Sequence, residues 1–174
     1  DKTNPLGQRN NLIIEMLYAT GLRVSELVNI KLSDINNYDN TIRVIGKGNK
    51  MRIVMFGSFC EDALKLYIDN GRCELDKYNS EYLFLNKNGG KLSDRSVRNI
   101  INDIIFKCSI DYKVSPHTLR HTFATDMLNN GADLISVKEM LGHSSLNTTS
   151  IYTHVSNAGI KKVYDFAHPR AKEK

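Results

Sequence analysis

Residues Ser115–His121 read Ser-Pro-His-Thr-Leu-Arg-His, a stretch that predicts both a helix start and a cluster of polar side chains. A serine side chain can accept a hydrogen bond from a free N–H group at a helix start, and proline is favoured in the first turn. We therefore expect a helix that starts at Pro116, with Ser115 as its N-cap. His117 and Arg120 are three residues apart, so they should share one face of this helix.

Two short stretches downstream of this helix carry further reactive side chains. Leu141-Gly142-His143 adds an imidazole, and Ile151-Tyr152-Thr153-His154 adds a phenol. Phosphate oxygens bind cations, and a phenol can act as a nucleophile in covalent catalysis. Together with Arg120, these residues suggest chemistry on a phosphodiester.

Hydrophobic spacing elsewhere predicts a mainly helical chain with a small antiparallel β-sheet, an α+β fold. Thr41–Ile45 and Met51–Met55 are β-prone runs that flank Gly46–Lys50, so we expect a β-hairpin with a cationic tip. Tyr82–Leu85 resembles a third short strand. The expected helices are 9–20, ended by Gly21; 23–29; 58–70; 93–107, capped by Ser93; 116 to Gly131; Asp133 or Leu134 to 141; and 157–166, while Asn147 or Thr148 would cap the segment that holds Tyr152.

Composition indicates a protein of one domain with an anionic partner. The chain has 174 residues and a net charge of +5, which suggests an anionic partner without identifying it, and the same charge could serve solubility alone. Cys60, Cys73 and Cys108 form no CxxC pair, so neither a disulfide framework nor a zinc site is indicated. No apolar run approaches the roughly 18 residues of a membrane span, and the start has no signal-peptide core, so we expect a cytoplasmic protein that does not enter a membrane.

Other candidate cations lie in the first third of the chain. Arg23 falls at an expected helix start, where free N–H groups favour an anion, although it could simply pair with Glu26. Lys47 at the hairpin tip could protonate a leaving oxygen, because a lysine with a pKa near 10.4 still carries a proton. Lys50 competes with it for this role, and either lysine could be a solvated turn residue. His117 could equally be a capping histidine, and His143 a loop histidine.

The order of these pieces resembles the catalytic domain of the tyrosine recombinases. The likeness extends from Leu12 to about Arg170 and includes features of the Xer-type recombinases, although integrases of phages and conjugative transposons share the catalytic residues. The matching segments are Thr20–Leu27, Gly46–Lys50, Ser115–His121, Leu141–His143 and Ile151–Val155. The Xer likeness is carried by the turn Gly46–Lys50, by Gly131–Leu134 and by His168–Ala171.

The resemblance implies a role for each candidate residue. Arg23 and Arg120 would clamp the scissile phosphate, Lys47 would be the general acid, and Tyr152 would attack. His117 would assist proton transfer, and His143 would bond a non-bridging oxygen. Glu26 would support the first arginine. The predicted DNA-contacting cations are Arg23, Lys47, Lys50, Arg52 and Arg120.

The implied reaction is cleavage of one DNA strand to a 3′-phosphotyrosyl bond and a free 5′-hydroxyl, followed by attack of a partner strand. The covalent bond conserves the phosphodiester energy, so neither a cofactor nor a metal ion is expected. Chromosome dimer resolution during cell division is the favoured role, and integration of a mobile element is the alternative. A type IB topoisomerase and a non-catalytic DNA-binding module are less favoured.

The resemblance also implies how the chain is organised. Residues 1–174 would form one C-terminal catalytic domain with a core of about residues 8–155, without the N-terminal core-binding domain of the family. Residues 156–174 would form a tail exchanged between protomers, through Ile160, Val163, Tyr164 and Phe166. A homo- or hetero-tetramer on two DNA sites, activated by a DNA translocase, is the expected assembly of the full-length protein.

Overall fold

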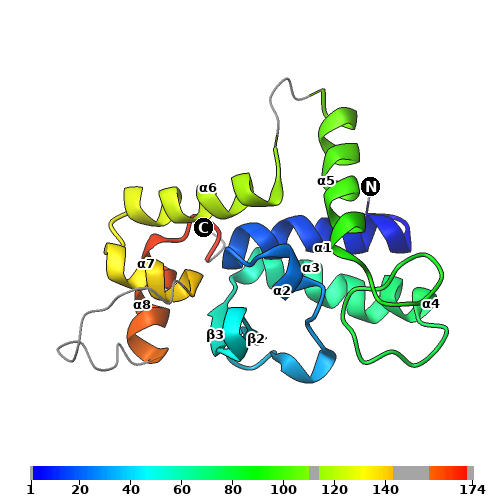
Figure 1. Cartoon of the computed structure of the whole chain (residues 1–174), viewed down its shortest axis with the longest axis horizontal. Coiled ribbons are helices and arrows are strands. Elements are labelled where there is room, and N and C mark those ends of the chain that lie inside the picture. The colour runs from blue at the N-terminus through cyan, green and yellow to red at the C-terminus, as the bar shows by residue number, and fades with distance from the viewer. Residues whose placement is uncertain (1, 110–113, 143–156, 172–174) are drawn as a thin grey trace.

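The structure, a computed structural model, describes residues 2–109, 114–142 and 157–171. Helices dominate, and the strands form one small antiparallel sheet, so the expected α+β class is confirmed (Figure 1). The helices are α1 Pro5–Thr20, α2 Val24–Leu27, α3 Ser58–Leu66, α4 Cys73–Leu75, α5 Asp94–Lys107, α6 Pro116–Asn129, α7 Leu134–Leu141 and α8 Asn157–Ala167; 3₁₀ turns span Leu32–Asp34 and Lys47–Asn49, and a π-helix spans Tyr67–Arg72.

The sheet contains the predicted β-hairpin. Strands β2 Thr41–Ile45 and β3 Met51–Met55 pair antiparallel, with Thr41 opposite Met55 and Ile45 opposite Met51. A two-residue strand, β1 Ile35–Asn36, which the sequence did not predict, pairs with the other edge of β2. Gly48 at the hairpin tip has a φ of 76°, a conformation that glycine adopts at little cost.

The larger hydrophobic core surrounds α1. Its inward residues Leu12, Ile13, Met16 and Leu17 are buried, as the spacing of apolar residues predicts. They pack with apolar residues of β2, β3, α3 and α5. Gly21 ends α1 with a φ of 63°, and the predicted end of this helix is confirmed.

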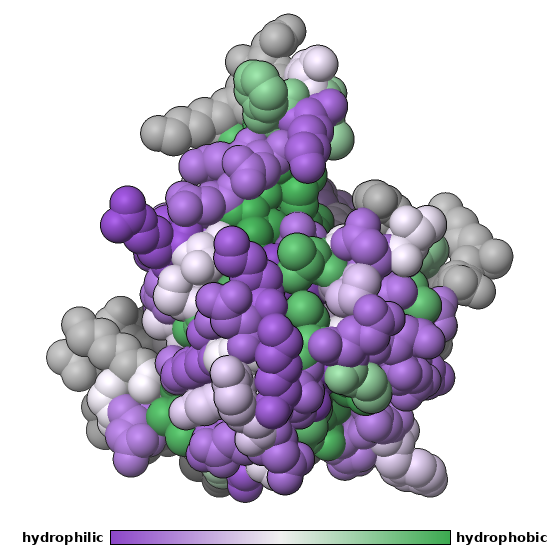
Figure 2. Space-filling model, turned by 90° about the vertical axis from the view of Figure 1, so that its right-hand side faces the viewer, coloured by the Kyte–Doolittle hydropathy of each residue, from purple (hydrophilic) through white to green (hydrophobic). Residues whose placement is uncertain are grey.

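A second core cluster holds α6, α7 and α8 together with Met55 of β3. Figure 1 shows these three helices gathered at one end of the molecule, opposite α4 and α5. The face seen in Figure 2 is mainly hydrophilic, with apolar areas between the polar side chains. The predicted starts of α6 and α7 are confirmed, since Ser115 accepts from the Thr118 N–H and Asp133 accepts from the Ser136 N–H.

Two predicted elements differ in type from the structure, and the predicted helix 23–29 is helical only over Val24–Leu27. Tyr82–Leu85 is not a strand: Leu83 donates to the Ile30 carbonyl, whereas Phe84 accepts from the Leu92 N–H, so successive residues pair with separate segments and no ladder forms. The predicted helix 58–70 is α-helical only to Leu66 and continues as a π-helix. In this wider turn the Gly71 N–H donates to Gln8 Oε1 (2.8 Å), which binds the turn to α1.

Helix α8 packs on its own chain. Ile160 and Tyr164 are buried in the second core cluster and Val163 packs against it, so these three side chains pack within the same chain in this structure. The fourth residue predicted to dock on a neighbour, Phe166, is 76% exposed. The Tyr164 hydroxyl donates to the Ala19 carbonyl (3.0 Å), so α8 is fixed to the end of α1. Exchange of the tail between protomers stays a prediction.

His168, just after α8, is a buried neutral histidine. Its ring stacks on Tyr164, Nδ1 accepts from the Arg170 N–H, and Nε2 lies 3.3 Å from the Tyr18 carbonyl. Nδ1 therefore carries the lone pair and Nε2 the proton. Burial lowers the pKa of His168 to about 4, against the weaker raising effect of the hydrogen bond to Tyr18.

His168 should make the stability of the protein depend on pH. The unfolded chain binds the proton with a pKa near 6.5, so the contribution of the neutral ring is present above pH 6.5 and is lost as the pH falls to about 4. The loss reaches up to about 3 kcal/mol. Urea unfolding at pH 7 and pH 4.5 should show a smaller difference for His168→Phe than for the wild type. An equal difference in both proteins would contradict this assignment.

Candidate phosphate-binding site

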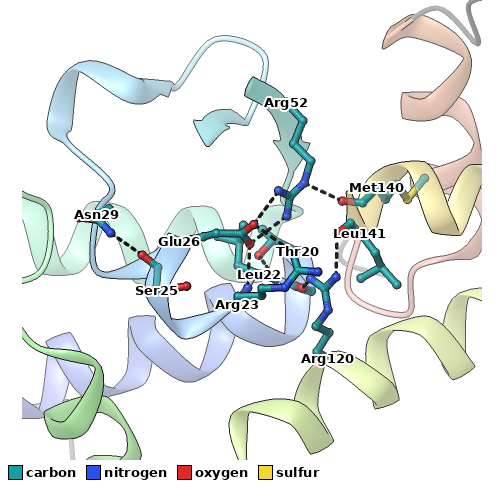
Figure 3. Close-up of polar contacts among 11 residues, drawn as sticks. Thr20, Leu22, Arg23, Ser25, Glu26, Asn29, Arg52, Arg120, Met140 and Leu141 are labelled. Carbon is teal, nitrogen blue, oxygen red and sulfur yellow. Dashed lines mark hydrogen bonds and ion pairs between the residues drawn. The ribbon is translucent and has the colours of Figure 1, made fainter. Parts of the chain in front are cut away.

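The site lies where the end of α1 meets α2, α6 and α7. Gly21 makes this approach possible, because a Cβ atom there would lie 2.7 Å from both Leu141 Cδ2 and Phe123 Cδ1. The left-handed conformation of Gly21 then directs the chain into α2, whose N-cap is Arg23. The packing of glycine against two helices therefore places Arg23 beside Arg120 of α6 (Figure 3).

Glu26 is the buried acidic centre of the site. Its carboxylate accepts from the Arg23 backbone N–H (2.9 Å) and from Arg23 Nη1 (3.3 Å). Arg52 of β3 donates to both carboxylate oxygens, with Nη1 at 2.8 Å and Nη2 at 2.9 Å. Burial alone would raise the pKa of Glu26, but the hydrogen bonds from Arg52 and Arg23 outweigh it and lower that pKa.

Arg120 is held by backbone carbonyls rather than by a carboxylate. Nη1 donates to the Gly21 carbonyl, and Nη2 donates to the Leu141 carbonyl at 2.7 Å. Burial lowers the pKa of Arg120 to about 10, and the positive charge of Arg23 adds to this effect. Arg120 is still protonated at neutral pH, and an anion bound between the two guanidinium groups would relieve their repulsion.

The arrangement is suited to a phosphate. Arg23, Arg52 and Arg120 meet around the single carboxylate of Glu26, so the described part of the site carries excess positive charge. Guanidinium groups present paired N–H donors that match phosphate oxygens. Within residues 2–109, 114–142 and 157–171, no group of three His, Cys, Asp or Glu side chains is placed to hold a metal ion.

The other predicted site residues lie around this centre or outside the described residues. His117 is exposed in the first turn of α6, and Lys50 is exposed at the base of the hairpin tip. Lys47 begins the 3₁₀ turn of the hairpin tip, and only its backbone is described. His143 and Tyr152 fall in the undescribed range 143–156, so their roles stay predictions.

The sequence prediction missed the contacts of Arg52. It was expected to touch DNA, but its side chain is only 14% exposed, and Nε also donates to the Met140 carbonyl (3.2 Å). The alternation of side chains along a strand could have predicted this burial. Arg52 lies two residues before buried Val54 and therefore on the inner face of β3. A cation on the inner face of a strand requires an acidic partner. Contact of Arg52 with DNA therefore rests on the family resemblance alone.

Comparison with known proteins is consistent with this geometry. The model of the phage integrase family matches residues 1–158. The chain belongs to the phage integrase family. The resemblance to tyrosine recombinases drawn from the motifs is thereby confirmed.

Relatives within the phage integrase family carry the Xer name. Tyrosine recombinase XerC of Anoxybacillus flavithermus is 52% identical over 174 residues, which cover 98% of this chain and 58% of that protein. XerC of Oceanobacillus iheyensis is 53% identical over 98% of this chain and 57% of its own length. The chain thus spans less than two thirds of these relatives.

Solved structures of family members have the same fold. The crystal structure of XerA recombinase matches with a TM-score of 0.74 and 37% identity, over 94% of this chain and 59% of that one. XerH recombinase, solved bound to its difH substrate before cleavage, matches with a TM-score of 0.71 and 34% identity, over 92% and 47%. The tyrosine recombinase catalytic-domain fold is therefore confirmed.

Proposed function

We propose that this protein is a site-specific recombinase that cleaves and rejoins DNA strands through a 3′-phosphotyrosyl intermediate. The observation that carries the proposal is the meeting of Arg23 and Arg120 at the end of α1, with Glu26 holding the first and two backbone carbonyls holding the second. Two fixed guanidinium groups can neutralise the charge that develops on the non-bridging oxygens during attack. The family membership supports the same activity.

The proposed cleavage forms one bond and breaks one. The Tyr152 oxygen attacks phosphorus and its proton passes to a base, with His117 assisting, while the bond from phosphorus to the 5′ oxygen breaks. Lys47 gives a proton to that oxygen, and His143 bonds a non-bridging oxygen. A 5′-hydroxyl of the partner strand then reverses these steps, so the number of phosphodiester bonds is conserved.

Chromosome dimer resolution is the proposed biological role, because the relatives named above are Xer proteins. The proposed partners are double-stranded DNA, a homo- or hetero-tetramer on two DNA sites and a DNA-translocase activator, all in the cytoplasm. No described helix has the length and apolarity to cross a membrane. Integration of a mobile element is the second candidate, since an integrase from the mycobacterium phage Brujita matches with a TM-score of 0.72 and 25% identity.

Covalent capture tests the proposed function. The longest natural polypeptide that contains this chain is incubated with a nicked suicide substrate, and an adduct that survives SDS is mapped by mass spectrometry. An adduct on Tyr152 is expected. Binding of the cognate DNA without an adduct, even with the activator present, would favour the non-catalytic DNA-binding module.

Lys47→Ala should cleave ordinary DNA slowly and be rescued on DNA with sulfur at the 5′ leaving position, because a thiolate leaves without a proton. We expect a loss of about 100-fold or more on the oxygen substrate and near wild-type cleavage on the sulfur substrate. Lys50→Ala is the matched control, three residues along the same hairpin tip. Rescue of Lys50→Ala in place of Lys47→Ala would transfer the general-acid role to Lys50.

A further inference from the structure

Arg52 is more recessed than Arg23 and contacts the groups that hold the two predicted phosphate clamps, Arg23 and Arg120. Its side chain is 14% exposed, against 37% for that of Arg23. On one side Arg52 donates two hydrogen bonds to Glu26, and Glu26 also accepts a hydrogen bond from Arg23. On the other side Arg52 donates to the Met140 carbonyl, one residue before the Leu141 carbonyl that Arg120 binds. Figure 3 shows the Arg52 guanidinium reaching from β3 to both partners.

Two glycines allow these contacts. A Cβ atom on Gly142, which has a φ of 67°, would lie 3.0 Å from the Cζ, Nε and Nη1 atoms of Arg52. A Cβ atom on Gly46 would lie 3.2 Å from Arg52 Nη1 and 3.3 Å from Glu26 Oε1. The Arg52–Glu26 pair is thus enclosed by the start of the hairpin tip and the end of α7.

The acceptors around Arg52 require a guanidinium. Three oxygens, two from Glu26 and one from Met140, receive its Nη1, Nη2 and Nε hydrogens. A planar fork satisfies this set, whereas an ammonium is a point charge on a flexible stem. The positive group also lies at the C-terminal end of α7, where the helix dipole favours a cation.

We propose that Arg52 is a positioning residue for strand cleavage, which fixes Arg23 through Glu26 and Arg120 through the end of α7, and that it does not bind DNA. The proposal rests on the proposed function, because it assigns Arg52 a part in the same reaction. Arg52 joins three segments that meet only in the folded chain: the hairpin, α2 and the last turn of α7. Loss of its fork would let the two clamps move independently.

The first test separates positioning from DNA contact. Arg52→Met and the milder Arg52→Lys are compared with Arg43→Met, which removes an exposed arginine from the neighbouring strand β2. Arg52→Met should form the covalent adduct about 100-fold more slowly, because displacement of a clamp by about 1 Å costs that much. Arg52→Lys should recover part of the rate. DNA affinity and its salt dependence should match the wild type for both.

A fall of about 0.9 in the slope of log affinity against log salt for Arg52→Met would overturn the proposal, because it would show a direct phosphate contact. An unchanged rate of adduct formation would overturn it as well. Arg43→Met should keep the wild-type rate, which shows that loss of a positive charge from the hairpin is not by itself enough.

The second test needs no DNA chemistry. Amide hydrogen exchange of the free protein should become about tenfold faster at Met140–Gly142 in Arg52→Met and stay unchanged in Arg43→Met, because only the first loses the bond to α7. Unchanged exchange at Met140–Gly142 in Arg52→Met would contradict the proposal that Arg52 anchors the end of α7, whatever the adduct assay shows. A wild type that forms no adduct would instead contradict the proposed function, and the exchange result would still decide whether Arg52 anchors α7.

Discussion

Tyr152→Phe is expected to bind the DNA site with wild-type affinity and to form no covalent adduct. The substitution removes only the phenolic oxygen that would attack phosphorus, so the cations that bind the phosphate backbone are unchanged. The effect on cleavage should be complete rather than partial. Fluorescence anisotropy measures binding, and an SDS gel of the nicked suicide substrate measures the adduct.

Tyr164→Phe is the matched control, since it removes one phenolic oxygen from the same end of the chain. Tyr164 is only 2% exposed, its hydroxyl donates to the Ala19 carbonyl, and burial raises its pKa well above the ordinary value. Its hydroxyl is therefore structural, and the Tyr164→Phe protein should still form the adduct. An adduct in Tyr152→Phe would show a different nucleophile, and exposed Tyr38 or Tyr78 would then be mapped first.

The local parts of the fold followed from short-range sequence signals. Ser93 and Ser115 cap α5 and α6 as predicted, and Gly21 ends α1, because caps depend on residues within one turn. The hairpin was equally local, since five residues on either side of one turn determine its pairing. The motif Ser115–His121 could be recognised from the sequence without knowing which other segments pack against it.

The rest could not be predicted because it depends on contacts between distant segments. The Arg52–Glu26 pair joins residues 26 positions apart, and the bond from Arg52 to Met140 joins residues 88 apart. The prediction of a strand at Tyr82–Leu85 was wrong for the same reason. A β-prone run forms a strand only if another backbone segment runs alongside it and pairs with successive residues. Burial of Tyr164 likewise depends on α8 packing against the end of α1, because its hydroxyl bonds to Ala19, 145 residues away in the sequence.

Arg120→Ala should slow adduct formation by about 30-fold or more, which corresponds to about 2 kcal/mol of lost charge stabilisation in the transition state. This variant loses both the phosphate contact and the structural hydrogen bonds of Arg120. The guanidinium no longer faces the phosphate, and the Gly21 and Leu141 carbonyls lose a donor that joins α1 to α7. Single-turnover cleavage at saturating DNA measures the first effect, and urea unfolding measures the second.

Arg120→Lys separates these two functions, because it keeps the positive charge and loses the fork. An ammonium can bond one of the two carbonyls or the phosphate but cannot match the paired geometry of a guanidinium. We therefore expect Arg120→Lys to unfold at nearly the wild-type urea concentration and still to cleave slowly. Near-normal cleavage by Arg120→Ala would reject Arg120 as a clamp. Normal cleavage by Arg120→Lys alone would mean that charge, and not the planar fork, is what the transition state requires.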